Sequence, residues 1–137
     1  MDIELLKLLF DTSLFILIWM IQLVVYPSFL YFKELDFKRW HSSYTGRITM
    51  IVLPLMMGQF VLYARSMLLD FSPYNTAMLL AVLSIWGITF FVSVPLHQDL
   101  DQRKDSLASR MKLVKTNWMR TAIWTVILII NIFNYGK

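Results

Sequence analysis

Four long apolar runs, separated by shorter polar and charged segments, dominate the pattern of this chain. A helix needs about 20 residues to cross roughly 30 Å of hydrocarbon. Only helices or a closed barrel can cross, because lipid cannot satisfy free backbone groups, and four runs are too few for a barrel. The pattern therefore predicts an all-α integral membrane four-helix bundle, with spans at about residues 5–31, 46–66, 74–96 and 117–135.

The segments between the runs differ in character. Residues 67–73 are nearly uncharged, and Ser72 and Pro73 supply an N-cap and a first-turn proline for the third helix. Residues 32–45 and 97–116 are longer and charged. Apolar residues at helical spacing predict an amphipathic helix over about 101–115 that lies on, or extends from, the bundle. Without a repeat or linker in the sequence, residues 1–137 are expected to form a single domain.

Composition supports the membrane interpretation. The chain is 58% hydrophobic and only 16% charged, against about 25% charged for a soluble domain, which excludes soluble, disordered and fibrous classes. The acidic start of the chain is unlike a signal peptide, so the first run is expected to remain as a span. With no cysteine, disulfides, thiolate metal sites and thiol nucleophiles are excluded.

The basic residues are distributed unevenly along the chain. Ten of the 13 Lys and Arg residues lie in or beside the two long connections. This bias predicts that both termini are outside and both charged connections are cytoplasmic, in the cell membrane, which is the cytoplasmic membrane in a bacterium. We therefore attribute the net charge of +4 to the orientation of the chain in the membrane and not to a surface that binds nucleic acid.

Two histidines are the first candidates for chemistry. His97 and Asp101 are four residues apart and share a helix face, so the carboxylate could orient the imidazole for base catalysis or metal ligation. Alternating helix directions bring His41 to the same membrane level, where His41, His97 and Asp101 could form an open metal site. The alternatives are solvated histidines at helix ends and, less favoured at this shallow depth, axial haem ligation.

The fourth span carries a polar stripe. Asn117, Arg120 and Trp124 stand at i, i+3 and i+7, so Arg120 can stack on Trp124 and face an anionic or enolate-like ligand. The alternative is an arginine that snorkels to the interface, with Trp118 in the aromatic belt.

Other polar and helix-breaking residues lie within the spans. Asp11 is expected to form a structural pair with Arg65, and a role in proton handling is the alternative. Pro27, Pro54 and Pro95 fall in the inner halves of three spans. They either mark a cavity that opens to the cytoplasm or reflect the general frequency of proline in membrane helices.

The motif Val94-Pro95-Leu96-His97-Gln98-Asp99-Leu100, followed after about sixteen residues by Asn117-Trp118-Met119-Arg120-Thr121, resembles the anthrone-oxygenase-like family of small four-helix membrane proteins. The resemblance implies a pocket near the inner membrane face that involves Pro95, His97, Trp118 and Arg120. It also implies oxidation of anthrones to anthraquinones by molecular oxygen without an evident cofactor. His97 stands where the family pattern has Asn, and the Trp40-His41-x-x-Tyr44-x-x-Arg47 segment has no counterpart in it.

These observations lead to two hypotheses. The first is an oxygenase-like oxidoreductase acting on a lipophilic aromatic or quinone-like molecule, either cofactor-free or assisted by one transition metal. In it, His97 oriented by Asp101 is the base, Arg120 and Asn117 hold the oxyanion, and the remaining pocket residues are His41, Tyr44, Trp118 and Trp124. The second is a non-enzymatic binding or assembly subunit, or a metal-binding membrane protein. Transport would require a homo-oligomer to form a path.

Overall fold

The computed structural model describes residues 2–102 and 107–136, and this part of the chain is helical apart from short connections. The elements are α1 (Ile3–Met20), the π-helical turn η1 (Ile21–Val25), α2 (Tyr26–Ser28), α3 (Glu34–Leu69), α4 (Pro73–Ile88), the π-helical turn η2 (Thr89–Ser93), α5 (Val94–Gln102) and α6 (Leu107–Asn134). Four helical stretches have the length and composition of membrane spans: Ile3–Ser28, Asp36–Leu69, Pro73–Gln102 and Leu107–Asn134. The prediction of an all-helical, multi-pass bundle is confirmed at this level.

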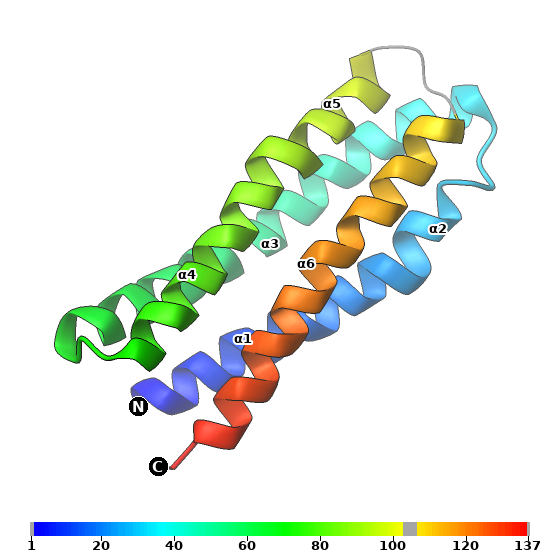
Figure 1. The fold of residues 1–137 in the computed structure, drawn as a ribbon. Helices are drawn as coiled ribbons and strands as arrows, with labels where there is room; N and C mark the ends of the chain where they lie inside the picture. The colour runs from blue at the N-terminus through cyan, green and yellow to red at the C-terminus, as the bar shows by residue number, and fades with distance from the viewer. Residues whose placement is uncertain (1, 103–106, 137) are drawn as a thin grey trace.

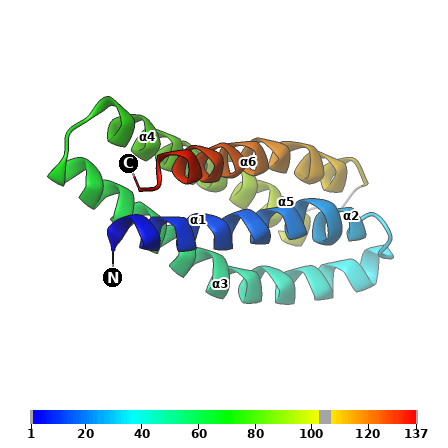
Figure 2. The same ribbon diagram turned by 90° about the horizontal axis from the view of Figure 1, so that it is seen from below.

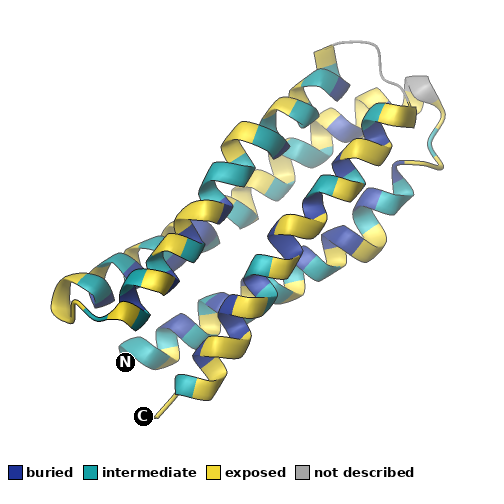
Figure 3. Ribbon diagram, in the orientation of Figure 1, coloured by how far each residue is buried: buried dark blue, intermediate teal, exposed yellow. Residues whose placement is uncertain are grey.

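The helices run alternately up and down and pack as a four-cornered bundle (Figures 1 and 2). α1 packs on α3 and α6, and α4 packs on the same two helices from the other side. Both termini and the α3–α4 connection lie at one end, called here the terminal end (Figure 1). The α2–α3 connection, the end of α5 and the start of α6 lie at the other, called here the connection end. Buried residues follow the inward faces, whereas exposed apolar residues cover the outside (Figure 3), as expected for helices that contact lipid.

The observed helices extend beyond the predicted spans at the connection end. α3 begins at Glu34, so most of the charged segment 32–45 is helix and not a loop. Phe37, His41 and Tyr44 lie on one face of α3, with ring centroids 5.3, 5.5 and 5.7 Å from the ring of Phe29. This aromatic packing stabilises the extra turns, while the charged residues remain on the outer face.

The predicted amphipathic helix at 101–115 is divided between two elements. Residues 101–102 end α5, residues 103–106 lie outside the described residues, and residues 107–115 form the first turns of α6. The last part therefore extends from the bundle, which is one of the two arrangements expected.

Proline explains where the helices change pitch. Each π-helical turn is followed, after one intervening residue, by a proline: Pro27 after η1 and Pro95 after η2. Because proline lacks an N–H and clashes with the carbonyl four residues earlier, a wider turn before it relieves the clash. At the start of α4, the Ser72 hydroxyl accepts a hydrogen bond from the Asn75 N–H at 3.3 Å, which confirms the predicted cap.

Candidate functional site

A chain of four hydrogen-bonded side chains runs inward from the connection end. The Asp101 carboxylate lies 2.7 Å from His41 Nδ1, and His41 Nε2 lies 2.8 Å from His97 Nδ1. His97 Nε2 in turn lies 2.9 Å from the Tyr26 hydroxyl. These residues come from α5, α3, α5 and α2, so three separate segments build one relay, called here the Asp–His–His–Tyr relay.

The protonation of the two rings sets the direction of these hydrogen bonds. With Asp101 ionised and both rings neutral, His41 donates from Nδ1–H to Asp101, His97 donates from Nδ1–H to His41 Nε2, and His97 Nε2 accepts the Tyr26 O–H. This arrangement has both imidazoles as Nδ1–H tautomers. Asp101 keeps 28% of its side-chain surface exposed whereas His41 is fully buried, so the relay has one partly exposed end, at Asp101.

The inner end of the relay borders a cavity of about 280 Å³. His97, Tyr26 and Arg120 line its polar side, and Tyr44 and Asp101 also contribute to its wall. The remaining lining side chains are mostly apolar: Ile21, Ile48, Val52, Leu53, Met56, Trp86, Phe90 and Val94. Five polar side chains complete the lining: Thr45, Thr49, Thr89, Ser93 and Gln98. The cavity therefore combines a polar, hydrogen-bonded floor with walls suited to a lipophilic molecule.

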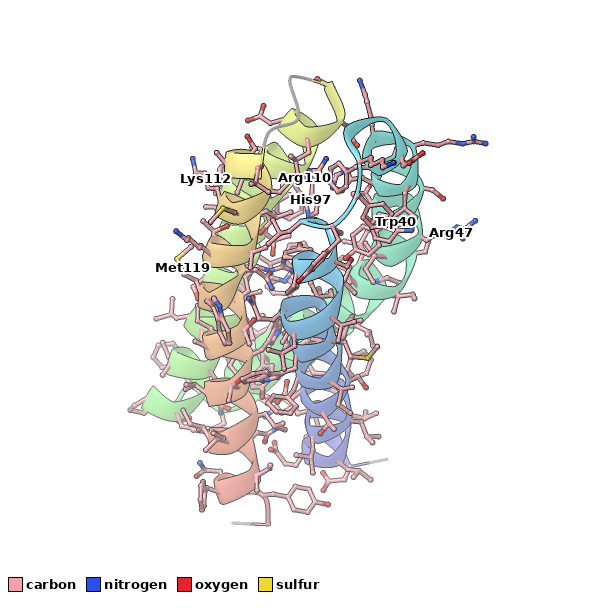
Figure 4. All side chains as sticks on the ribbon, turned by 90° about the vertical axis from the view of Figure 1, so that its right-hand side faces the viewer. Trp40, Arg47, His97, Arg110, Lys112 and Met119 are labelled. Atoms are coloured by element: carbon pink, nitrogen blue, oxygen red, sulfur yellow. The ribbon has the colours of Figure 1, made fainter. Side chains whose placement is uncertain are left out.

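The cavity lies where the stretch from η2 into α5 separates from α3. α3 contacts α4 and α5, but in the described part of the chain it makes no close backbone contact with η2, which lies between them. Four lining side chains are exposed: the apolar Leu53 and Phe90, at 44% and 50%, and the polar Thr49 and Gln98. The opening, called here the mouth, therefore lies on the side of the bundle and has both apolar and polar edges. Figure 4 shows His97 between the helices, whereas Arg47 on α3 points away from them.

Arg120 is buried near the middle of α6, at the edge of this cavity. Its guanidinium lies 5.1 Å from the centroid of the Trp124 ring, so the predicted cation–π contact is present. Its Nη1 lies 3.4 Å from Asn117 Oδ1 and 3.5 Å from Ser93 Oγ, both at the long limit of a hydrogen bond. Its Nε has no partner among the described residues.

The structure changes the roles of several predicted residues. Asp101 hydrogen-bonds to His41 and not to His97, so it would orient His97 only through His41. Asn117 does not line the cavity. Its amide donates to Gln22 Oε1 at 2.9 Å while its oxygen faces Arg120, so it positions the arginine and does not hold a ligand.

Of the four predicted pocket residues, only Tyr44 lines the cavity. His41 is fully buried behind His97, and Trp124 lies against Arg120 with its indole N–H donating to Gln59 Oε1 at 3.2 Å. Trp118 is 46% exposed and packs edge-on against Trp19. Trp118 therefore lies outside this cavity, on the outer side of α6.

The three predicted metal ligands lie close together, but they bond to one another in series and do not surround a common point. Both nitrogens of His41 are engaged, one by Asp101 and one by His97. Among residues 2–102 and 107–136, no group of three or more His, Asp or Glu side chains converges as a metal site would. The geometry thus favours a proton relay over metal ligation by these residues.

Asp11 belongs to a second buried cluster, nearer the terminal end. Its carboxylate accepts hydrogen bonds from Gln59, Tyr63 and Asn131 at 2.7, 2.6 and 2.8 Å. The predicted partner Arg65 is exposed, because its side chain lies on the outer face of α3, so the Asp11–Arg65 pair was wrong. Lys7, one turn before Asp11, is buried and binds Glu4 at 2.8 Å.

Sequence reasoning missed two further residues that hold the connection end and the cavity together. Tyr26 completes the relay. In the sequence, its spacing of four from the polar Gln22 and its place next to Pro27 were the features that could have indicated an inward-facing hydroxyl. Arg110, read only as a topology charge, is buried and donates to the carbonyl oxygens of Phe29 and Phe32 at 2.6 and 2.9 Å. It thereby satisfies free carbonyl groups where the first span ends.

In comparisons with known proteins, no family model, no curated protein and no solved structure matches this chain. The resemblance to anthrone-oxygenase-like proteins therefore rests on the motif at residues 94–100 and 117–121 alone.

Proposed function

We propose that this multi-pass membrane protein is an oxygenase that acts on a lipophilic aromatic molecule with a C–H group made acidic by a conjugated carbonyl. The observation that carries the proposal is the Asp–His–His–Tyr relay, which ends at an apolar cavity next to a buried arginine. A base and a cation beside one cavity are the two groups that enolate formation needs.

The relay supplies the base. With neutral rings, His97 Nε2 accepts a hydrogen bond from the Tyr26 hydroxyl. The substrate C–H either displaces this hydroxyl and gives its proton to His97 directly, or gives its proton to Tyr26 while Tyr26 gives its own to His97. When a proton arrives at His97 Nε2, the proton on His97 Nδ1 can shift to His41 Nε2. Asp101 stabilises the resulting charge on His41 and holds that ring in position.

Arg120 supplies the electrostatic stabilisation. Deprotonation of the carbon places negative charge on the conjugated carbonyl oxygen, and the guanidinium at the cavity wall would hold that enolate oxygen. Trp124 and Asn117 fix the guanidinium in place.

The overall reaction balances with molecular oxygen as the co-substrate. The enolate carbon adds O₂, and the resulting peroxide takes up the proton held by the relay. Loss of water then leaves a ketone, so that CH₂ and O₂ give C=O and H₂O. This assignment follows the chemistry that the sequence resemblance implies.

The test uses anthrone as the probe and protein purified into nanodiscs, with oxygen uptake and anthraquinone formation as readouts. We expect oxygen uptake above that of empty nanodiscs, and a loss of about 10²- to 10⁴-fold in His97→Gln. Arg47→Gln, at an exposed arginine on the same end of α3, is the control and should keep the wild-type rate. Thermal melting of each variant checks that it is folded. Binding of the probe without oxygen uptake would overturn the enzymatic proposal in favour of a carrier.

The orientation in the membrane is part of the proposal. The uneven distribution of Lys and Arg supports cytoplasmic placement of the connection end, with both termini outside. The solvent-exposed end of the relay would then exchange protons with the cytoplasm.

A further inference from the structure

We infer that the cavity takes lipophilic acids: molecules that arrive from the bilayer with an oxygen already ionised, such as an aromatic carboxylate or phenolate, and place it on Arg120. This inference rests on the proposed function for its site and narrows the class of substrate that the site accepts.

The first support is a contrast between the two buried arginines. Arg110 lies 3.8 Å over the ring of Phe37 and donates two short hydrogen bonds to carbonyl oxygens. Arg120 is equally buried, at 5% exposed, yet its Nη1 has only two contacts, at 3.4 and 3.5 Å. Since a guanidinium has five N–H donors, Arg120 retains donor capacity that its protein neighbours leave unused.

The second support is the charge balance around the cavity. The ion pairs among the described residues join Lys7 to Glu4 and His41 to Asp101, and neither includes Arg120. The partners of Arg120 are the Asn117 amide, the hydroxyls of Ser93 and Tyr26 and the Trp124 ring, and none of them is a carboxylate. A buried cation without a counter-ion is costly in a membrane, so a ligand anion would complete the site.

The third support is the direction of access. The unpartnered Nε belongs to a side chain that lines the cavity. The exposed lining side chains at the mouth are the apolar Leu53 and Phe90 and the polar Thr49 and Gln98. A molecule with an apolar body and an ionised oxygen matches this mixed edge, with its body along Leu53 and Phe90 and its oxygen at the guanidinium. Planar carboxylates suit this cation because they accept two parallel hydrogen bonds from it.

The experiment compares two probes of nearly the same shape, anthracene-9-carboxylate and anthracene-9-methanol, by equilibrium dialysis against protein in phosphatidylcholine nanodiscs. Empty nanodiscs are measured in parallel to subtract partitioning into lipid. We expect the wild-type protein to bind the carboxylate at least about tenfold more tightly than the alcohol, because only the carboxylate neutralises Arg120. Equal affinity for the two probes in the wild-type protein would overturn the inference without the need for any variant.

Variants and lipid then locate the anion site. Arg120→Gln should abolish the preference for the carboxylate, whereas Arg120→Lys and the exposed control Arg47→Gln should retain it; a preference that survives in Arg120→Gln would overturn the assignment. Adding phosphatidylglycerol distinguishes a free acid from a lipid headgroup as the anion, because displacement of the carboxylate by this lipid would identify the headgroup. The binding experiment is independent of the oxygenase test. A preference for the carboxylate without oxygen uptake would support the anion site and overturn the oxygenase activity.

Discussion

At the residue scale, the chemistry of this protein depends on side chains that reach one another across helices. Asp101 illustrates the point: its helical spacing from His97 predicted a direct contact, but its carboxylate reaches His41 on α3. Spacing along one helix can identify residues on a common face, yet it cannot show which of two nearby imidazoles a carboxylate selects. That selection depends on the packing of α3 against α5, which the sequence does not reveal.

The relay predicts non-additive effects on activity. His97→Gln removes the base. Asp101→Asn replaces the charged acceptor that orients His41 by a neutral amide, which can also donate and so favour the other tautomer, and this change should lower oxygen uptake with anthrone by at least about tenfold. The double variant should be no slower than His97→Gln alone, because both changes disable one unit. Rates that fall by the product of the two single effects would show that Asp101 and His97 act separately.

The Asp11 cluster predicts a change in stability. Asp11→Ala leaves the side chains of Gln59, Tyr63 and Asn131 without their buried acceptor. We expect a loss of about 2 to 4 kcal/mol, seen as a lower melting temperature in detergent. Asp36→Ala, at an exposed position, is the matched control, and an equal effect at both positions would show that the cluster contributes no stability.

At the scale of elements, the long apolar runs and the Ser72 cap could be predicted because hydrophobicity and capping are local properties. The start of α3 at Glu34 could not be predicted from such local properties. Charged residues suggested a connection there, but the aromatic side chains on the opposite face find their partner in Phe29, which is distant in the chain before folding. The π-helical turns before Pro27 and Pro95 likewise needed the structure.

The contact between α1 and α3 predicts a position where bulk is not tolerated. A Cβ added at Gly58 would lie 2.1 Å from the nearest ring carbon of Phe10, whereas at Gly46 it would meet nothing within 4 Å. Gly58→Leu should therefore destabilise the bundle by about 1 to 3 kcal/mol through overpacking, while Gly46→Leu should have little effect. Melting temperatures in one detergent compare them, and equal values would show that α1 and α3 can separate without cost.

At the scale of the whole molecule, alternating helix directions allowed His41, His97 and Arg120 to be predicted at one region of the bundle, and the structure brings His97 and Arg120 to one cavity with His41 behind them. The lateral mouth could not be predicted, because it depends on the separation of α3 from η2. The proposal of a lipophilic substrate rests on a cavity that opens on the side of the bundle, next to a relay whose carboxylate is partly exposed at the connection end.

The orientation of the molecule can be tested directly because the natural chain contains no cysteine. Ser42 in the early part of α3 and Phe71 in the α3–α4 connection are both exposed. Single cysteines at these positions provide a matched pair for labelling with a membrane-impermeant maleimide in intact cells. We expect Phe71→Cys to be labelled and Ser42→Cys to be protected until the cells are opened. The reverse pattern would place the connection end outside.

The most direct test of the Asp–His–His–Tyr relay is the ¹⁵N NMR spectrum of protein labelled only at histidine, because the chain contains two histidines. The relay predicts two neutral rings, each protonated at Nδ1 and unprotonated at Nε2, with a scalar coupling between His41 Nε2 and His97 Nδ1 across their hydrogen bond. His41→Gln assigns the signals and should remove the coupling. Rings protonated at Nε2, or two independent imidazoles in exchange with solvent, would contradict the relay and with it the proposed base.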